Sequence, residues 1–172
     1  MNRIAVFIAG VLILPSALCA QLSPSSSVRP DSLLDLLVGE WEMAGAVRGK
    51  PARYTLHAER VLQNKYVELH MTDVATPLRY EARVIIGMAG KPGEYIAHWI
   101  DNTGAQYSVP PATGTQRGDT LYLDFPYPDG AFHDTFAYDR AMRVWHFKLE
   151  AADGKGGWVT FADYLVRPVK SR

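Results

Sequence analysis

The sequence predicts an all-β fold: an antiparallel up-and-down barrel of about 8–10 strands with a short N-terminal helix. Turn-forming residues divide the chain beyond Gly39 at intervals of about a dozen residues. The segments between them alternate between inward and outward side chains. No segment after Leu37 shows helical periodicity over three turns, which argues against α/β nucleotide-binding folds. Many short antiparallel strands usually close into a barrel because closure removes exposed edges. An open two-layer sandwich is the alternative, because turn spacing does not distinguish the two.

The first 20 residues have the pattern of a secretory signal peptide. Arg3 precedes the apolar run Ile4–Leu14, and small residues follow as far as Ala20. The run is short of the roughly 20 apolar residues that a membrane helix needs. An uncleaved anchor and lipid attachment at Cys19 are the alternatives. We therefore predict cleavage near Ala20, a periplasmic or secreted mature chain without a membrane span, and a flexible Ser/Pro-rich lead-in over 21–30.

Residues 31–168 are predicted to form one domain, because the chain has 172 residues and 48% apolar side chains. Its 18 basic and 18 acidic residues cancel. Without a basic surplus, the chain lacks the main driving force for binding nucleic acid. Cys19, the single cysteine, leaves with the predicted signal peptide, so thiolate nucleophiles and thiolate metal sites are excluded from the mature chain.

The elements follow from local patterns along the chain. Asp31 or Ser32 caps a predicted helix of two turns, its leucines face the core, and Gly39 ends it. Strands are predicted where inward residues recur at every second position, as in Leu121, Leu123 and Phe125. The same alternation runs from Tyr80 to Met88 and from Trp145 to Leu149. The nine turn groups that separate the strands are 48–51, 63–64, 76–77, 91–93, 101–104, 117–119, 128–130, 139–140 and 153–157.

The entry to the first strand, Leu37-Val38-Gly39-Glu40-Trp41, resembles the G-x-W entry of lipocalins and other calycin barrels. In those barrels the tryptophan closes one end and an arginine of the last strand packs across it, so the resemblance implies that Arg167 covers Trp41. Tyr95–Asp101 followed by Gly104 is similar to a group of uncharacterised bacterial secreted lipocalin-like proteins. That resemblance implies fold and compartment, and no activity. A more distant likeness to haem-binding, nitrobindin-like barrels implies a histidine ligand on a late strand, but no histidine here matches it.

The chain contains no nucleophile elbow, zinc-protease helix, Walker loop or dinucleotide-binding fingerprint. Its five histidines lie in different predicted strands without the close spacing of a metal site, so no metal or catalytic residue is predicted. His98 shares a strand face with Ile96 and Ile100, and it points inward if they do. A barrel hydrolase or isomerase that uses His98 as a base with Asp134 as an inward acid is the enzyme alternative.

Aromatic residues recur on successive strands, and in a small barrel many of them must point inward. Ten strands would leave a cavity, in which a few polar groups would orient an apolar guest. We therefore expect a non-enzymatic protein that binds a small apolar or amphipathic ligand without a cofactor. A haem-binding barrel and a fully packed structural or interaction module are also compatible with the sequence. The predicted ligand contacts are Tyr80, Tyr95, His98, Trp99, Asp134, Phe136 and Trp145.

Overall fold

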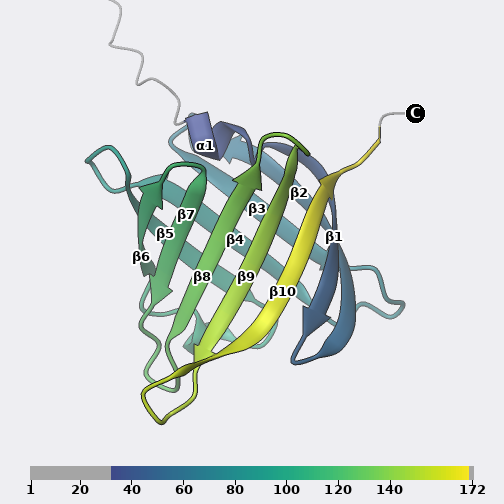
Figure 1. Ribbon diagram of the computed structural model, residues 1–172, viewed down its shortest axis with the longest axis vertical. Coiled ribbons are helices and arrows are strands. Elements are labelled where there is room, and N and C mark those ends of the chain that lie inside the picture. The colour runs from purple at the N-terminus through teal and green to yellow at the C-terminus, as the bar shows by residue number, and fades with distance from the viewer. Residues whose placement is uncertain (1–31, 171–172) are drawn as a thin grey trace, which may run out of the picture.

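The computed structural model describes residues 32–170, which form a closed antiparallel barrel (Figure 1). Each strand pairs with its neighbours in sequence, and the first strand pairs with the last. The strands are β1 (Gly39–Val47), β2 (Lys50–Val61), β3 (Tyr66–Asp73), β4 (Glu81–Met88), β5 (Glu94–Asp101), β6 (Ala112–Arg117), β7 (Thr120–Phe125), β8 (Phe132–Asp139), β9 (Val144–Ala152) and β10 (Trp158–Pro168). The predicted up-and-down barrel of about 8–10 strands is therefore confirmed, with ten strands, and the open sandwich is excluded. The predicted signal peptide, lead-in and Asp31 cap lie outside the described residues.

The nine predicted turn groups all fall at the connections between strands. In the first connection Arg48 and Gly49 both have positive φ, at 48° and 73°, as a tight hairpin turn requires. The predicted alternation is also present: Leu121, Leu123 and Phe125 are at most 2% exposed, whereas Tyr122 between them is 38% exposed. Turn chemistry and period-two patterning therefore locate the strands of this chain.

The pairing of β1 with β10, which closes the barrel, requires a close approach of the two backbones at Gly45. A Cβ atom at this position would lie 1.9 Å from the carbonyl oxygen of Asp163 on β10. No side chain fits into that distance, so glycine is needed for β1 to pair with β10.

One end of the barrel is covered by α1 (Ser32–Asp35), a single helical turn that is shorter than the two turns expected (Figure 1). Leu33, Leu34 and Leu37 are each 1% exposed and join the barrel core. The indole Nε1 of Trp41 donates to the carbonyl of Leu37 at 2.7 Å, and Trp145 Nε1 donates to the carbonyl of Leu36 at 3.2 Å. Two indoles thus hold the segment after α1 against this end of the barrel.

Arg167 does not pack across Trp41, so this implication of the resemblance is wrong. Arg167 is opposite Glu42 in the β1–β10 register and is exposed, while Trp41 is opposite Pro168 and is 7% exposed. Residues directly opposite each other in an antiparallel pair share a face, and neighbours along a strand face opposite sides. Arg167 therefore lies on the outer surface, one position out of phase with the inward tryptophan. Between residues 32 and 170 no helix has the length and hydropathy to cross a bilayer.

Candidate functional site

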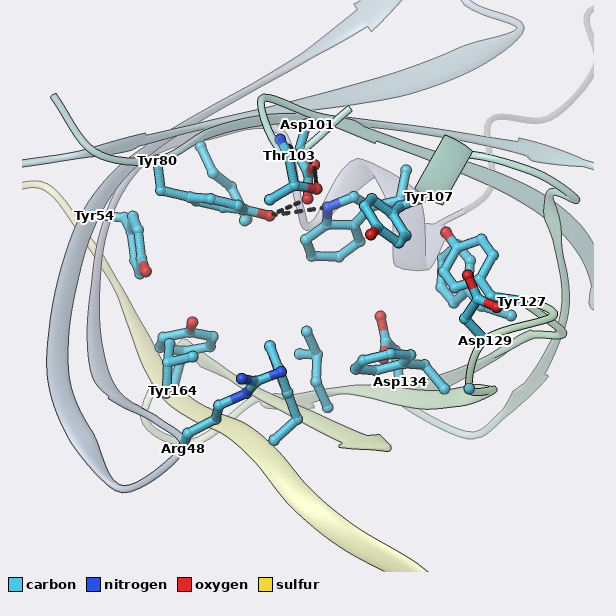
Figure 2. A pocket seen from close by; sticks show the side chains of 18 residues that line it. Arg48, Tyr54, Tyr80, Asp101, Thr103, Tyr107, Tyr127, Asp129, Asp134 and Tyr164 are labelled. Carbon is cyan, nitrogen blue, oxygen red and sulfur yellow. Dashed lines mark hydrogen bonds between the residues drawn. The ribbon is translucent and has the colours of Figure 1, made fainter. Parts of the chain in front are cut away.

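A cavity of about 550 Å³ occupies the end of the barrel opposite α1 (Figure 2). Because β1 begins near α1 at Gly39, its far end at Val47 and the following Arg48 mark the other mouth of the barrel. The cavity walls include both of these residues and the connections β5–β6 and β7–β8. Its lining consists of Val47, Arg48, Tyr54, Met71, Tyr80, Trp99, Asp101, Thr103, Tyr107, Phe125, Tyr127, Asp129, Gly130, Phe132, Asp134, Leu149, Phe161 and Tyr164.

The cavity wall is aromatic for much of its circumference. Tyr54 meets Tyr80 edge-to-face at a centroid distance of 5.8 Å and meets Tyr164 in the same way at 5.7 Å. Trp99 and Phe125 form a third edge-to-face pair at 6.2 Å. In Figure 2 the hydroxyls of Tyr54, Tyr80 and Tyr164 are directed into the cavity. The wall therefore offers flat apolar faces together with hydrogen-bonding groups, as small-molecule sites generally do.

A hydrogen-bonded chain fixes one side of this wall (Figure 2). Trp99 Nε1 donates to the Tyr80 hydroxyl at 3.1 Å, and this hydroxyl donates to Asp101 Oδ2 at 3.0 Å. The other carboxylate oxygen, Asp101 Oδ1, accepts the backbone N–H of Thr103 at 2.9 Å. The carboxylate therefore stabilises the turn after β5 and at the same time holds two aromatic rings in one orientation.

Burial raises the pKa of four tyrosine hydroxyls in the cavity lining. The pKa of Tyr80 is raised, first by desolvation and then by the negative charge of Asp101. Desolvation is also the largest cause of the raised pKa values of Tyr54, Tyr127 and Tyr164. A hydroxyl whose pKa lies above its usual value of 10.0 remains a hydrogen-bond donor at neutral pH.

Asp134 is the unusual member of the lining. It lies on β8 between the filled part of the barrel and the cavity, and it is 3% exposed. Its Oδ1 atom and the Tyr127 hydroxyl are buried without a hydrogen-bond partner among the described residues. Desolvation raises the pKa of Asp134 well above its usual value, and the charge of Asp124 adds to the increase. Buried polar atoms are normally paired, so these two mark an unfilled hydrogen-bonding site.

Three of the seven predicted contacts, Tyr80, Trp99 and Asp134, line the cavity. The inward residues Tyr95, Phe136 and Trp145 do not, because they lie in the half of the barrel where side chains fill the interior. Phe136 stacks on Phe147 at 4.0 Å, and the Tyr95 hydroxyl donates to Gln116 Oε1 at 2.6 Å. These three residues belong to the packed core.

His98 does not point into the cavity, so the inward direction expected for it is wrong. Ile96 and Ile100, which share its strand face, are 40% and 41% exposed. The inward face of β5 carries Tyr95, Ala97 and Trp99 instead. His98 Nε2 lies 2.7 Å from the carbonyl oxygen of Ser108, and this contact supports the β5–β6 connection. His98 and Asp134 therefore do not form the acid–base pair that the enzyme alternative requires.

Several lining residues were not predicted from the sequence. Tyr164 follows Ala162 and precedes Val166 in a period-two pattern, so its inward direction could have been read from the alternation. Tyr107 lies in η1 (Ala105–Tyr107) and Tyr127 in the β7–β8 connection, where no periodicity operates. Arg48 belongs to a hairpin turn, and only closure of the barrel brings it near the cavity.

The lining contains no histidine, so the residues present do not fit a haem held by an axial histidine in this cavity. The two histidines of the late strands, His133 on β8 and His146 on β9, are exposed or half-buried on the outer face, and His133 pairs with Asp124. Over residues 32–170 no group of three or more His, Cys, Asp and Glu side chains is placed to hold a metal ion. The chain matches no protein-family model, and a search of curated proteins found no match.

Proposed function

We propose that this barrel binds one small apolar or amphipathic molecule without transforming it. The observation that carries the proposal is the aromatic cavity of about 550 Å³, into which the buried carboxyl of Asp134 projects with one oxygen that has no partner in the described part of the chain. Sites for small molecules typically have volumes of about 300–1,000 Å³ and a few polar groups on apolar walls. A fully packed structural module would leave no such space at the mouth of the barrel.

The family and the compartment are part of the same proposal. A closed antiparallel barrel with Trp41 at its covered end supports a lipocalin-like protein, as the G-x-W entry implies. The pattern of residues 1–20 supports export and cleavage near Ala20. In the periplasm or outside the cell, such a barrel would carry or sequester its ligand. The His98–Asp134 pair that the enzyme alternative requires is not formed, because His98 lies on the outer face of β5.

The proposal is tested by extracting the natively purified protein with organic solvent and analysing the extract by mass spectrometry. The emptied protein is then titrated with the neutral fluorescent probe N-phenyl-1-naphthylamine. We expect one bound probe per chain. Met71→Trp places a larger side chain in the cavity, because Met71 is 3% exposed and lies in its lining. It should weaken probe binding about tenfold or more, which corresponds to about 1.4 kcal/mol.

Met142→Trp is the matched control, because Met142 is 61% exposed in the β8–β9 connection at the other end of the barrel. Probe binding by this variant should equal that of the unaltered protein. An empty extract together with no probe binding would overturn the proposed function. Equal binding by both variants would show that the probe occupies another site.

A further inference from the structure

The charged groups around the cavity are mainly acidic. Asp101, Asp129 and Asp134 belong to the lining, and among the residues that the structure describes Arg48 is the one Lys or Arg residue in it. Asp129 is exposed at the mouth, and Asp101 is bound to Tyr80 and to the turn after β5. Only Asp134 combines deep burial with a carboxylate oxygen that has no partner among the described residues. A negatively charged ligand would lie near three carboxyl groups, so the charged side chains of the lining favour a positively charged ligand.

The position of Asp134 defines where such a charge would lie. Its register partners are Leu123 on β7 and Leu149 on β9, and Phe136 lies two residues further along β8 toward the packed core. The carboxyl group is therefore surrounded by apolar side chains on the wall and has the cavity in front of it. Figure 2 shows it opposite Asp101 and Thr103, directed into the open space. A buried carboxylate is stable only when a cation or several donors compensate its charge.

The aromatic faces supply the second part of a cation site. Nine of the 18 lining residues are Phe, Tyr or Trp. The faces of such rings carry negative charge density and attract ammonium and guanidinium groups within about 6 Å. The Phe161 ring already has such a contact within the protein, because the Arg48 guanidinium carbon lies 5.0 Å above the centre of this ring. The same wall thus accepts a flat apolar body and a positive charge together.

We propose that the ligand of this cavity is an organic cation, a protonated amine on a flat aromatic or apolar body, whose nitrogen donates to the Asp134 carboxylate. The proton that Asp134 holds in the empty cavity is released to solvent when the cation binds. This inference rests on the proposed function, because it names the ligand class of the same cavity. The ammonium group supplies both the missing hydrogen-bond donor and the compensating charge, whereas a neutral hydroxyl supplies only the donor. The rings of Trp99, Phe125 and Phe132 would contact the body of the ligand.

Three probes with one ring system and different charge test this inference. 1-Naphthylmethylamine is a cation at neutral pH, 1-naphthalenemethanol is neutral, and 1-naphthoate is an anion. Each is titrated into the emptied protein in competition with N-phenyl-1-naphthylamine. We expect the amine to bind about tenfold or more tightly than the alcohol, and the anion to bind most weakly.

Asp134→Asn keeps the size of the side chain, but the amide cannot ionise to the carboxylate that would compensate the charge of the ammonium group. It should weaken binding of the amine about tenfold and change binding of the alcohol less than about threefold, so that the preference for the cation disappears. Asp163→Asn is the matched control, because Asp163 is exposed on the outer face of β10 and the substitution is the same change from aspartate to asparagine. It should leave all three affinities unchanged.

The outcomes separate this inference from the proposed function. Equal or tighter binding of the alcohol, or an amine preference that survives Asp134→Asn, would overturn the cation inference and leave a barrel for neutral guests. Displacement of the probe by none of the three compounds would overturn it as well. Failure of the emptied protein to bind N-phenyl-1-naphthylamine, with no ligand in the extract, would overturn the proposed function itself.

Discussion

The two ends of the barrel consist of the same ten strands but have different interiors. At the end near α1, large apolar side chains fill the space, and Leu33 and Leu34 add a cover. The indole N–H groups of Trp41 and Trp145 there are bound to backbone carbonyls. At the other end a cavity of about 550 Å³ remains, and Tyr107 of η1 belongs to its lining.

The polar groups of the two ends differ in the same way. The two indole N–H groups of the covered end have partners inside the protein, whereas the Oδ1 atom of Asp134 and the hydroxyl of Tyr127 have none within residues 32–170. Covering and filling one end stabilises the barrel, because buried apolar surface contributes about 25 cal/mol per Å². The other end is then free to keep incompletely satisfied groups for a ligand. The residues that stabilise the fold and the residues proposed to bind a ligand thus lie at opposite ends of the barrel.

A pair of tryptophan substitutions gives the largest expected contrast between the ends. Trp145 is 1% exposed in the packed end, so Trp145→Ala should lower the free energy of unfolding by about 3–5 kcal/mol through the void that it leaves. Trp99 already borders the cavity, so Trp99→Ala should cost less than about 2 kcal/mol. Denaturant unfolding followed by circular dichroism measures both values. Equal losses would contradict the division of the barrel into a filled and an open end.

The raised pKa of Asp134 makes the free energy of unfolding depend on pH. The folded chain holds this proton to a higher pH than the unfolded chain, whose aspartate titrates near 3.8. The free energy of unfolding contributed by this group therefore falls as pH rises above about 4, by about 1.4 kcal/mol for each unit of pKa difference. Asp134→Asn cannot ionise, so in the absence of ligand it should be more stable than the unaltered protein at neutral pH.

The measurement for this prediction is the difference in unfolding free energy between the two proteins at several pH values. Taking the difference removes the contributions of Asp119 and Asp153, whose lowered pKa values act in the opposite direction. The advantage of Asp134→Asn should be absent near pH 3 and grow toward pH 7. A difference that stays constant over this range would show that Asp134 is ionised normally in the folded protein.

The smallest expected effect is that of Tyr80→Phe. This change removes the hydroxyl that joins Trp99 to Asp101, and it should cost about 0.5–1.5 kcal/mol in denaturant unfolding, because water in the cavity can replace the lost partner. Tyr122→Phe on the outer face is the control, with an expected change within about 0.5 kcal/mol. A loss several times larger for Tyr80→Phe would place this network among the groups that hold the fold together.

The strand β5 shows why part of the site could not be predicted, because its sequence does not indicate which of its two faces points inward. Both sets of alternate residues on this strand carry large apolar side chains: Ile96 and Ile100 on one face, Tyr95 and Trp99 on the other. Period-two patterning identifies a strand here but does not say which face is buried. The structure places the aromatic face inward, so the prediction for Trp99 agrees with the cavity lining and that for His98 does not.

The cavity itself depends on packing that no local pattern records. Phe136 and Asp134 point inward from the same strand, yet one meets Phe147 at stacking distance and the other meets open space. Which of them contacts a ligand depends on how far the covering segment and the neighbouring strands fill the interior. The polar lining residues from connections, such as Arg48 and Tyr127, come together only when the barrel closes.

The sequence by itself predicted the all-β class of fold, a strand number of about 8–10 and the approximate positions of the connections, because turn residues and alternation act over a few neighbouring positions. The tertiary structure decided which face of β5 is inward, where Arg167 lies relative to Trp41, and which end of the barrel stays hollow. These features depend on distances between side chains that are far apart along the chain. Such distances are fixed only when β1 and β10 meet and the interior volume is shared among all ten strands.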